Sequence, residues 1–106
     1  MLTLPIKKEW YDMILSGEKK EEYREIKSYY TKRFLNSGLL REAVNPETES
    51  ITIEHDGVNW VMFRNGYDKS SPSFRALVQI SIGKGRTEWG ATPGKQYYIL
   101  HILSIE

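Results

Sequence analysis

The first residues alternate between apolar and other side chains and then change to a helical spacing. Apolar residues occupy every second position over 2–6, which predicts a short opening strand with one buried face. Pro5 has no backbone N–H to donate, so it fits only at the edge or the end of a strand. From about Lys8 the apolar residues follow helical spacing, and Gly17 stands where a left-handed cap ends a helix of about two to three turns.

The next two segments are an extended charged stretch and a second helix. Residues 19–26 are too charged for a core strand, although Tyr23 is expected to point inward. Ser28 is expected to cap a helix over 29–36, and Gly38 to end it. Within this helix, two aromatic side chains one turn apart are expected to stack, at Tyr30 and Phe34.

Beyond the second helix the pattern turns to sheet. Residues 39–44 fit neither period, and residues 45–47 have the composition of a loop. The dipeptide Asp56-Gly57 stands between two β-rich runs, at 51–53 and 58–63, and predicts a hairpin turn there.

The last third of the chain holds the clearest strand. Apolar residues occupy every second position over 74–82, after a reversal at Asn65-Gly66. Residues 83–95 contain four glycines and predict a long loop. Residues 97–105 are apolar in both phases, as in a strand covered on both sides. Because no βαβ unit recurs, we expect one α+β domain over 1–106, a small barrel of antiparallel-looking strands instead of a parallel sheet.

Composition narrows the class of protein. The 106 residues are 40% hydrophobic and 27% charged, which fits one folded domain. The net charge of +1 provides no global attraction to nucleic acid or anionic lipid, so any polyanion site is a local patch. The chain has no cysteine for a disulfide or thiol nucleophile and no long apolar run. We expect a cytoplasmic protein without membrane contact, metal or cofactor.

The segment 17–24 combines an ammonium, a carboxylate and a guanidinium just after a helix end. A lysine supplies a mobile point charge for phosphate, and an arginine supplies a planar fork. Glu22 would orient Arg24, accept a hydroxyl or serve as a general base. The alternative is a solvated charge run whose ion pair is worth about 0 to 1 kcal/mol.

This segment reads G-x-K-x-x-E-x-R and resembles the signature of the ASCH domain family, a branch of the PUA-like superfold. All four specified positions match, at Gly17, Lys19, Glu22 and Arg24. Further segments resemble small ASCH proteins from bacteria and their phages, at 4–7, 10–16, 63–67 and 88–98. The resemblance implies a small PUA-like β-barrel of about five or six mostly antiparallel strands with two or more helices packed on it. It also implies a cleft floored by the signature residues, and binding of RNA or a nucleotide.

Two alternatives to simple binding stay open. Some ASCH relatives cleave RNA, and others deacylate N4-acetylcytidine. In the deacylases, a lysine activates a threonine that serves as the nucleophile. Lys19 matches that lysine, but Glu22 stands where the threonine would be, so an enzyme would use these two residues differently. The other alternative is a protein-interaction domain whose partner the sequence does not name.

Further candidates for nucleic-acid contact come from outside the signature. Lys7 is expected to add positive potential at the cleft, with a solvent-facing lysine as the alternative. Arg64 and Tyr67 flank a turn and would contact phosphate and stack on a base, with a partly buried aromatic of the barrel as the alternative for Tyr67. Trp89 would also stack on a base, and its alternative role is to close one end of the barrel. The two histidines are expected to be a hydrogen-bonded core residue and an exposed one, at His101 and His55 respectively.

Overall fold

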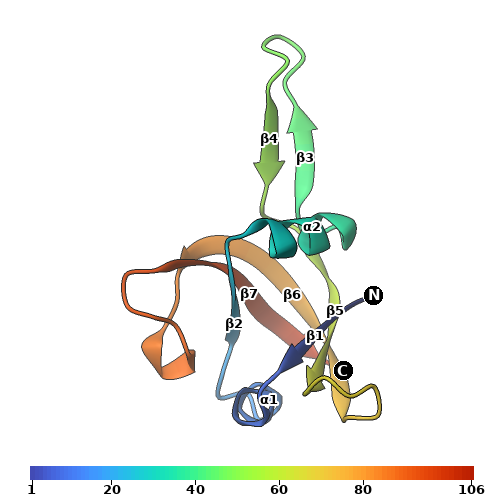
Figure 1. Ribbon diagram of the computed structural model, residues 1–106, viewed down its shortest axis with the longest axis vertical. Coiled ribbons are helices and arrows are strands. Elements are labelled where there is room, and N and C mark those ends of the chain that lie inside the picture. The colour runs from blue at the N-terminus through green and yellow to red at the C-terminus, as the bar shows by residue number, and fades with distance from the viewer.

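Seven strands, two α-helices and one short 3-10 helix follow one another in the computed structural model, which describes residues 1–106 (Figure 1). In chain order they are β1 (Leu2–Ile6), α1 (Lys8–Leu15), β2 (Glu21–Glu25), α2 (Ser28–Asn36), β3 (Arg41–Val44), β4 (Ile51–Glu54), β5 (Val58–Asn65), β6 (Ser73–Lys84), η1 (Thr87–Trp89) and β7 (Gln96–Ile105). Neither α-helix has the length and the apolar character that crossing a membrane requires.

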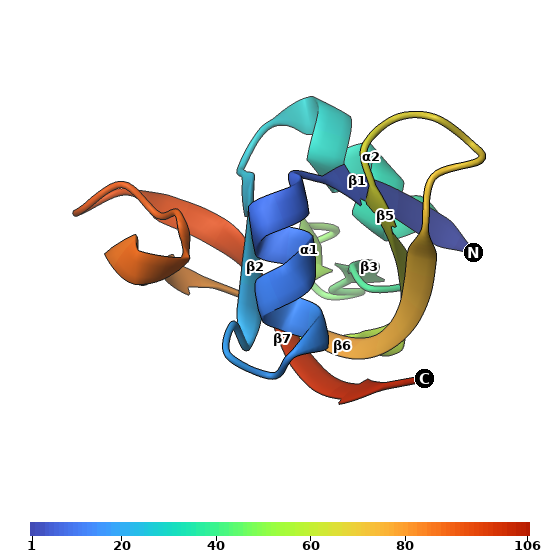
Figure 2. The same cartoon turned by 90° about the horizontal axis from the view of Figure 1, so that it is seen from below.

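Five of the strands form one curled sheet in the order β1-β5-β6-β7-β2. The β1–β5 pair is parallel and the other three pairs are antiparallel. The sheet curls round the core, with α1 at its lower end and α2 at its upper end (Figures 1 and 2). The expected α+β architecture is therefore confirmed, and Pro5 lies in an edge strand as its missing N–H requires.

The core is built from the inward phase of the strands. In β6 the alternation expected from the sequence buries Phe74, Ala76, Val78 and Ile80. Helices α1 and α2 complete this core with fully buried side chains, at Ile14 and Phe34.

A second, smaller cluster lies on the other face of the sheet. It contains Tyr23, Ala91, Tyr97 and Ile99, with Trp89 packed against it. Strand β7 is thus covered on both sides over its first half, as expected. Its C-terminal half is more open, because Leu103 is 52% exposed.

The two helices end where the sequence predicts, but one cap differs. Gly17 and Gly38 have φ angles of +86° and +81°, so both helices end at left-handed glycines. Ser28 is not the N-cap of α2, because the helix begins one residue earlier than expected and Lys27 holds that position without a side-chain cap. Tyr30 and Phe34 stack with ring centroids 6.0 Å apart, as predicted.

The prediction of a hairpin turn at Asp56-Gly57 is wrong. Strand β4 pairs with β3, whereas β5 pairs with β1 and β6, so the dipeptide separates two different sheets. The actual turn closes between Asn45 and Ser50, where a backbone hydrogen bond of 2.9 Å joins the strands. Strands β3 and β4 form an arm, residues 41–54, that projects away from the rest of the molecule (Figure 1).

Gly57 has a long-range reason to be glycine. A Cβ atom at this position would lie 2.1 Å from the backbone oxygen of Leu39. A glycine is therefore required at position 57 because two chain segments cross closely at the base of the arm, and not because the chain makes a tight turn there.

Candidate functional site

Lys19 is completely buried just after the end of α1. Its backbone N–H donates to the Met13 oxygen at 2.9 Å, which ties the turn through Gly17 to the helix. Its Nζ donates to the Trp89 backbone oxygen at 2.7 Å and lies 3.2 Å from Glu22 Oε1. The side chain has no exposed surface, so Lys19 holds β2 and the η1 segment together from inside.

Glu22 and Arg24 share one face of β2 and form an ion pair, as the alternation predicts. Arg24 Nη1 donates to Glu22 Oε2 at 2.7 Å. Since the other carboxylate oxygen faces Lys19, both oxygens of Glu22 are engaged by cations. A general base needs a lone pair directed at the substrate, and this carboxylate would first have to leave an ion pair.

Aromatic rings surround the Lys19 ammonium. Its Nζ lies 5.1 Å from the Trp10 ring centroid and 4.8 Å from the Tyr23 ring centroid, within cation–π range. Burial lowers the pKa of Lys19 below its ordinary value, and the nearby Glu22 carboxylate opposes this shift.

Tyr23 fastens the loop that carries Trp89. Its hydroxyl donates to Glu21 Oε1 at 2.7 Å and accepts the Arg86 backbone N–H at 2.9 Å. Burial raises the pKa of Tyr23 well above its usual range, because the phenolate would lose hydration. Gly85 lies against the same ring, since a Cβ there would be 2.6 Å from it.

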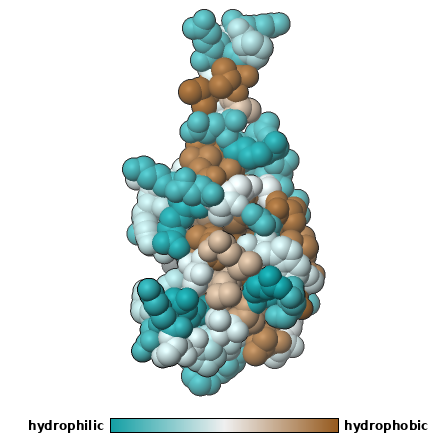
Figure 3. Space-filling model, turned by 90° about the vertical axis from the view of Figure 1, so that its right-hand side faces the viewer, coloured by the Kyte–Doolittle hydropathy of each residue, from teal (hydrophilic) through white to brown (hydrophobic).

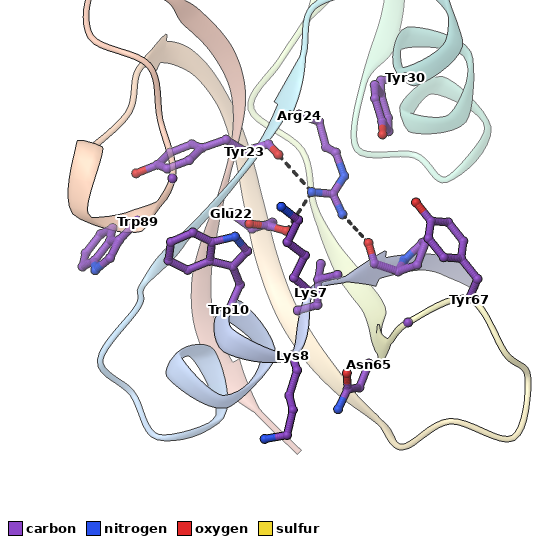
Figure 4. Close-up of a pocket in the computed structure, with 14 residues that line it drawn as sticks. Lys7, Lys8, Trp10, Glu22, Tyr23, Arg24, Tyr30, Asn65, Tyr67 and Trp89 are labelled. Atoms are coloured by element: carbon purple, nitrogen blue, oxygen red, sulfur yellow. Dashed lines mark hydrogen bonds and ion pairs between the residues drawn. The ribbon is translucent and has the colours of Figure 1, made fainter.

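A pocket of about 460 Å³ opens in front of this buried cluster (Figure 4). Six parts of the chain line it: the end of β1, the start of α1, strand β2, helix α2, the end of β5 with the loop after it, and the η1 segment. The lining side chains that carry polar or aromatic groups are Lys7, Lys8, Trp10, Glu22, Tyr23, Arg24, Tyr30, Asn65, Tyr67 and Trp89. The volume falls in the range of small-molecule sites.

The structure brings most of the candidate residues to this pocket. Five of them line it, namely Lys7, Glu22, Arg24, Tyr67 and Trp89. Lys19 lies behind the lining, with its charge turned to Glu22 and Trp89. Arg64 is not in the lining, because its strand neighbour Phe63 is buried in the core and the alternation turns Arg64 to the opposite face.

Three of the lining groups that were not among the sequence-based candidates shape the pocket. Trp10 packs against the backbone of Gly90, where a Cβ atom would lie 3.1 Å from Trp10 Cζ2. Tyr30 reaches the pocket from α2, and Pro5 offers its backbone oxygen to Arg24. The helical spacing could identify Trp10 and Tyr30 only as packing residues, and nothing in the sequence marks a single backbone carbonyl.

The two histidines lie outside the pocket. His101 is hydrogen-bonded as expected, with Nε2 2.7 Å from Ser81 Oγ and Nδ1 3.5 Å from Glu21 Oε2. It is not a core residue, because its side chain is 38% exposed on the opposite face of the sheet from the main core. His55 is exposed at the base of the arm, as expected.

The pocket has an unbalanced positive charge. Glu22 is already paired with two cations, and Lys8 is paired with Asp12 at 2.6 Å. Lys7 is exposed and has no ion-pair partner, so its ammonium is available to an anionic ligand.

Comparisons of this chain with family models, curated proteins and solved structures each find no match.

Proposed function

We propose that this chain is an ASCH-type domain that binds RNA or a nucleotide in the pocket between α1, β2 and the η1 segment. The observation that carries the proposal is the unpaired Lys7 ammonium at the rim of a pocket lined by aromatic side chains. A cation next to aromatic faces matches a ligand that combines phosphate with a planar base.

The aromatic residues support a ligand with a stacking surface. Trp10, Tyr67 and Trp89 come from three separate segments and meet at one pocket (Figure 4). Stacking of a base on such a ring contributes about 1 to 3 kcal/mol and tolerates different bases. The volume of about 460 Å³ accommodates a ligand of nucleotide size.

The signature residues take different roles in this proposal from those expected for them. Lys19 has no exposed side-chain surface, so it acts by positioning Glu22 and Trp89 instead of contacting phosphate. Arg24 is 12% exposed at the pocket and already donates to three acceptors, so it presents a fixed positive floor. Lys7 then provides the mobile phosphate contact.

Fluorescence anisotropy with labelled single-stranded RNA, single-stranded DNA and nucleotides at low salt tests the proposal. We expect Lys7→Ala to weaken binding about tenfold and to lower its salt dependence, because one phosphate contact is lost. Lys84→Ala is the matched control, since Lys84 is an exposed lysine outside the pocket. Absence of binding at low salt, or equal affinities for the two variants, would show that the proposal is wrong.

The hydrolase alternative has less support from the geometry. Both oxygens of Glu22 face cations, and the Lys19 amine is enclosed by protein. Incubation of the protein with labelled RNA and with N4-acetylcytidine provides the check. Turnover that disappears in Glu22→Gln would favour an enzyme over a binding module.

A further inference from the structure

The arm formed by β3 and β4 has one largely apolar face with no covering element. Val44 stands directly opposite Ile51 in the hairpin, and Ile53 lies two residues further along on the same face. These side chains are 64%, 64% and 44% exposed, respectively. They form the apolar patch visible on the projecting arm in Figure 3.

The other face of the arm is polar apart from Ala43, and Glu42, opposite Ile53, is the charged side chain on the apolar face. Arg41 and Glu54 are opposite each other on the polar face and form an ion pair of 2.6 Å, next to Thr52. A two-stranded hairpin on its own has marginal stability in water. An amphipathic hairpin that projects from its domain therefore gains stability when another surface covers its apolar face.

The distribution of charge along the chain indicates which surface covers the apolar face of the arm. Residues 41–56 hold five acidic side chains and one arginine, a formal charge of −4. Since the whole chain carries +1, the remaining residues carry +5. Two arms would repel each other, whereas the arm of one chain is attracted to the rest of a second copy.

A receiving surface lies at the opposite end of the molecule. A hollow of about 200 Å³ there is lined in part by Lys20, Leu103 and Ile105. Leu103 and Ile105 are 52% and 37% exposed, so this end of β7 also presents apolar side chains beside a lysine. The arm and the C terminus lie towards opposite ends of the long axis of the molecule, whose extents are 47 × 31 × 23 Å (Figure 1).

We propose that two copies of this chain form a symmetric dimer in which each arm covers the hollow beside Lys20 and Leu103 of its partner. A two-fold axis perpendicular to the long axis sets the two chains antiparallel and makes both contacts at once. Such an arrangement is closed, so association stops at two chains. The apolar arm residues meet Leu103 and Ile105, and the arm glutamates meet the more basic remainder of the partner.

Sedimentation equilibrium of the full chain between about 5 and about 500 µM tests the dimer. We expect a mass that rises to twice the chain mass of 12.4 kDa, and a dissociation constant that increases at least about tenfold when salt rises from about 50 to about 500 mM. The single-chain mass at every concentration would overturn the proposal. The salt measurement needs no variant.

Variants locate the interface. Ile51→Thr and Leu103→Thr should each raise the dissociation constant at least about tenfold, whereas Thr52→Ala on the polar face of the arm should not change it. Unchanged far-ultraviolet circular dichroism verifies that each variant is folded. A dimer that neither Ile51→Thr nor Leu103→Thr weakens would rule out this interface.

A mixing experiment distinguishes arm-to-hollow contact from arm-to-arm contact. In a hybrid of Ile51→Thr with Leu103→Thr, both substitutions fall in one arm-to-hollow contact and the other contact is unaltered. Because two substitutions that face each other in one contact cost less together than the sum of their separate costs, the mixture should associate more tightly than either variant alone. If the arms contacted each other, the mixture would associate no more tightly than Leu103→Thr alone. That result would overturn the reciprocal arrangement.

Discussion

Arg24 donates a hydrogen bond from Nη2 to the backbone oxygen of Pro5 at 2.9 Å. Pro5 lies in β1 and Arg24 in β2, the two edge strands of the main sheet, so one side chain links both ends of the curl. The other terminal nitrogen, Nη1, donates to Glu22 Oε2 and to the Tyr23 backbone oxygen. The spacing of charges on β2 thus has a structural consequence: it ties two strands that no ladder joins.

We predict that Arg24→Lys lowers the free energy of unfolding by about 2 to 4 kcal/mol, since an ammonium cannot span all three acceptors of the planar guanidinium. Urea denaturation followed by circular dichroism measures this change. Arg75→Lys is the matched control, because Arg75 forms an exposed ion pair with Glu106 whose loss costs under about 1 kcal/mol. Equal losses in the two variants would contradict the linking role of Arg24.

Lys19 should give the protein a distinctive pH dependence. Burial lowers its pKa in the folded chain, so between that pKa and the unfolded value near 10.5 the unfolded chain binds more protons. The contribution of Lys19 to the free energy of unfolding therefore increases with pH across this interval. Lys19→Met should lack this increase when both proteins are unfolded in urea between about pH 7 and about pH 10. Parallel pH profiles would contradict the prediction.

Tyr23 should have the opposite effect at higher pH. Its pKa is raised by burial, so above about pH 10 the unfolded chain loses a proton that the folded chain keeps. The stabilising contribution of Tyr23 is complete below that pH and is lost as pH rises further. In urea unfolding above about pH 10, Tyr23→Phe should lose stability less steeply than the unaltered protein. A steeper loss in the variant would be inconsistent with a buried neutral phenol.

Local patterns predicted the elements well where each element depends on its own residues. The alternation over 74–82 corresponds to β6, and the change to helical spacing near Lys8 corresponds to α1. The prediction failed at Asp56-Gly57, because this dipeptide also occurs where a glycine is needed for close approach. The backbone of Leu39 that requires Gly57 is distant in sequence, and no local pattern contains it.

The candidate site was also predictable only where it depends on the spacing of nearby residues. The period of two along β2 placed Glu22 and Arg24 on one face, and their ion pair follows from that period. The burial of Lys19 depends on the Trp89 backbone oxygen, seventy residues away in sequence. Spacing alone therefore identified the charged groups but not which of them faces solvent.

Gly57→Ala should be strongly destabilising, although it adds only one methyl group. The new Cβ would meet backbone at 2.1 Å, and backbone cannot move aside as a flexible side chain can. We expect a loss of about 3 kcal/mol in the free energy of unfolding. Gly83→Ala is the control, because its Cβ would lie at an ordinary 3.4 Å from Ile99 Cδ1, and its effect should stay within about 0.5 kcal/mol.

Substitution of Tyr67 tests ligand binding by the pocket independently of the stability of the fold. Its side chain is 89% exposed at the pocket rim, so Tyr67→Ala should leave the midpoint of urea unfolding unchanged. If a base stacks on this ring, the same variant should weaken RNA binding by about 1 to 3 kcal/mol in fluorescence anisotropy. Tyr67→Phe keeps the aromatic face and should bind like the unaltered protein. Full affinity in Tyr67→Ala would remove Tyr67 from the proposed binding surface, because no other contribution of an exposed ring could compensate for the lost stacking.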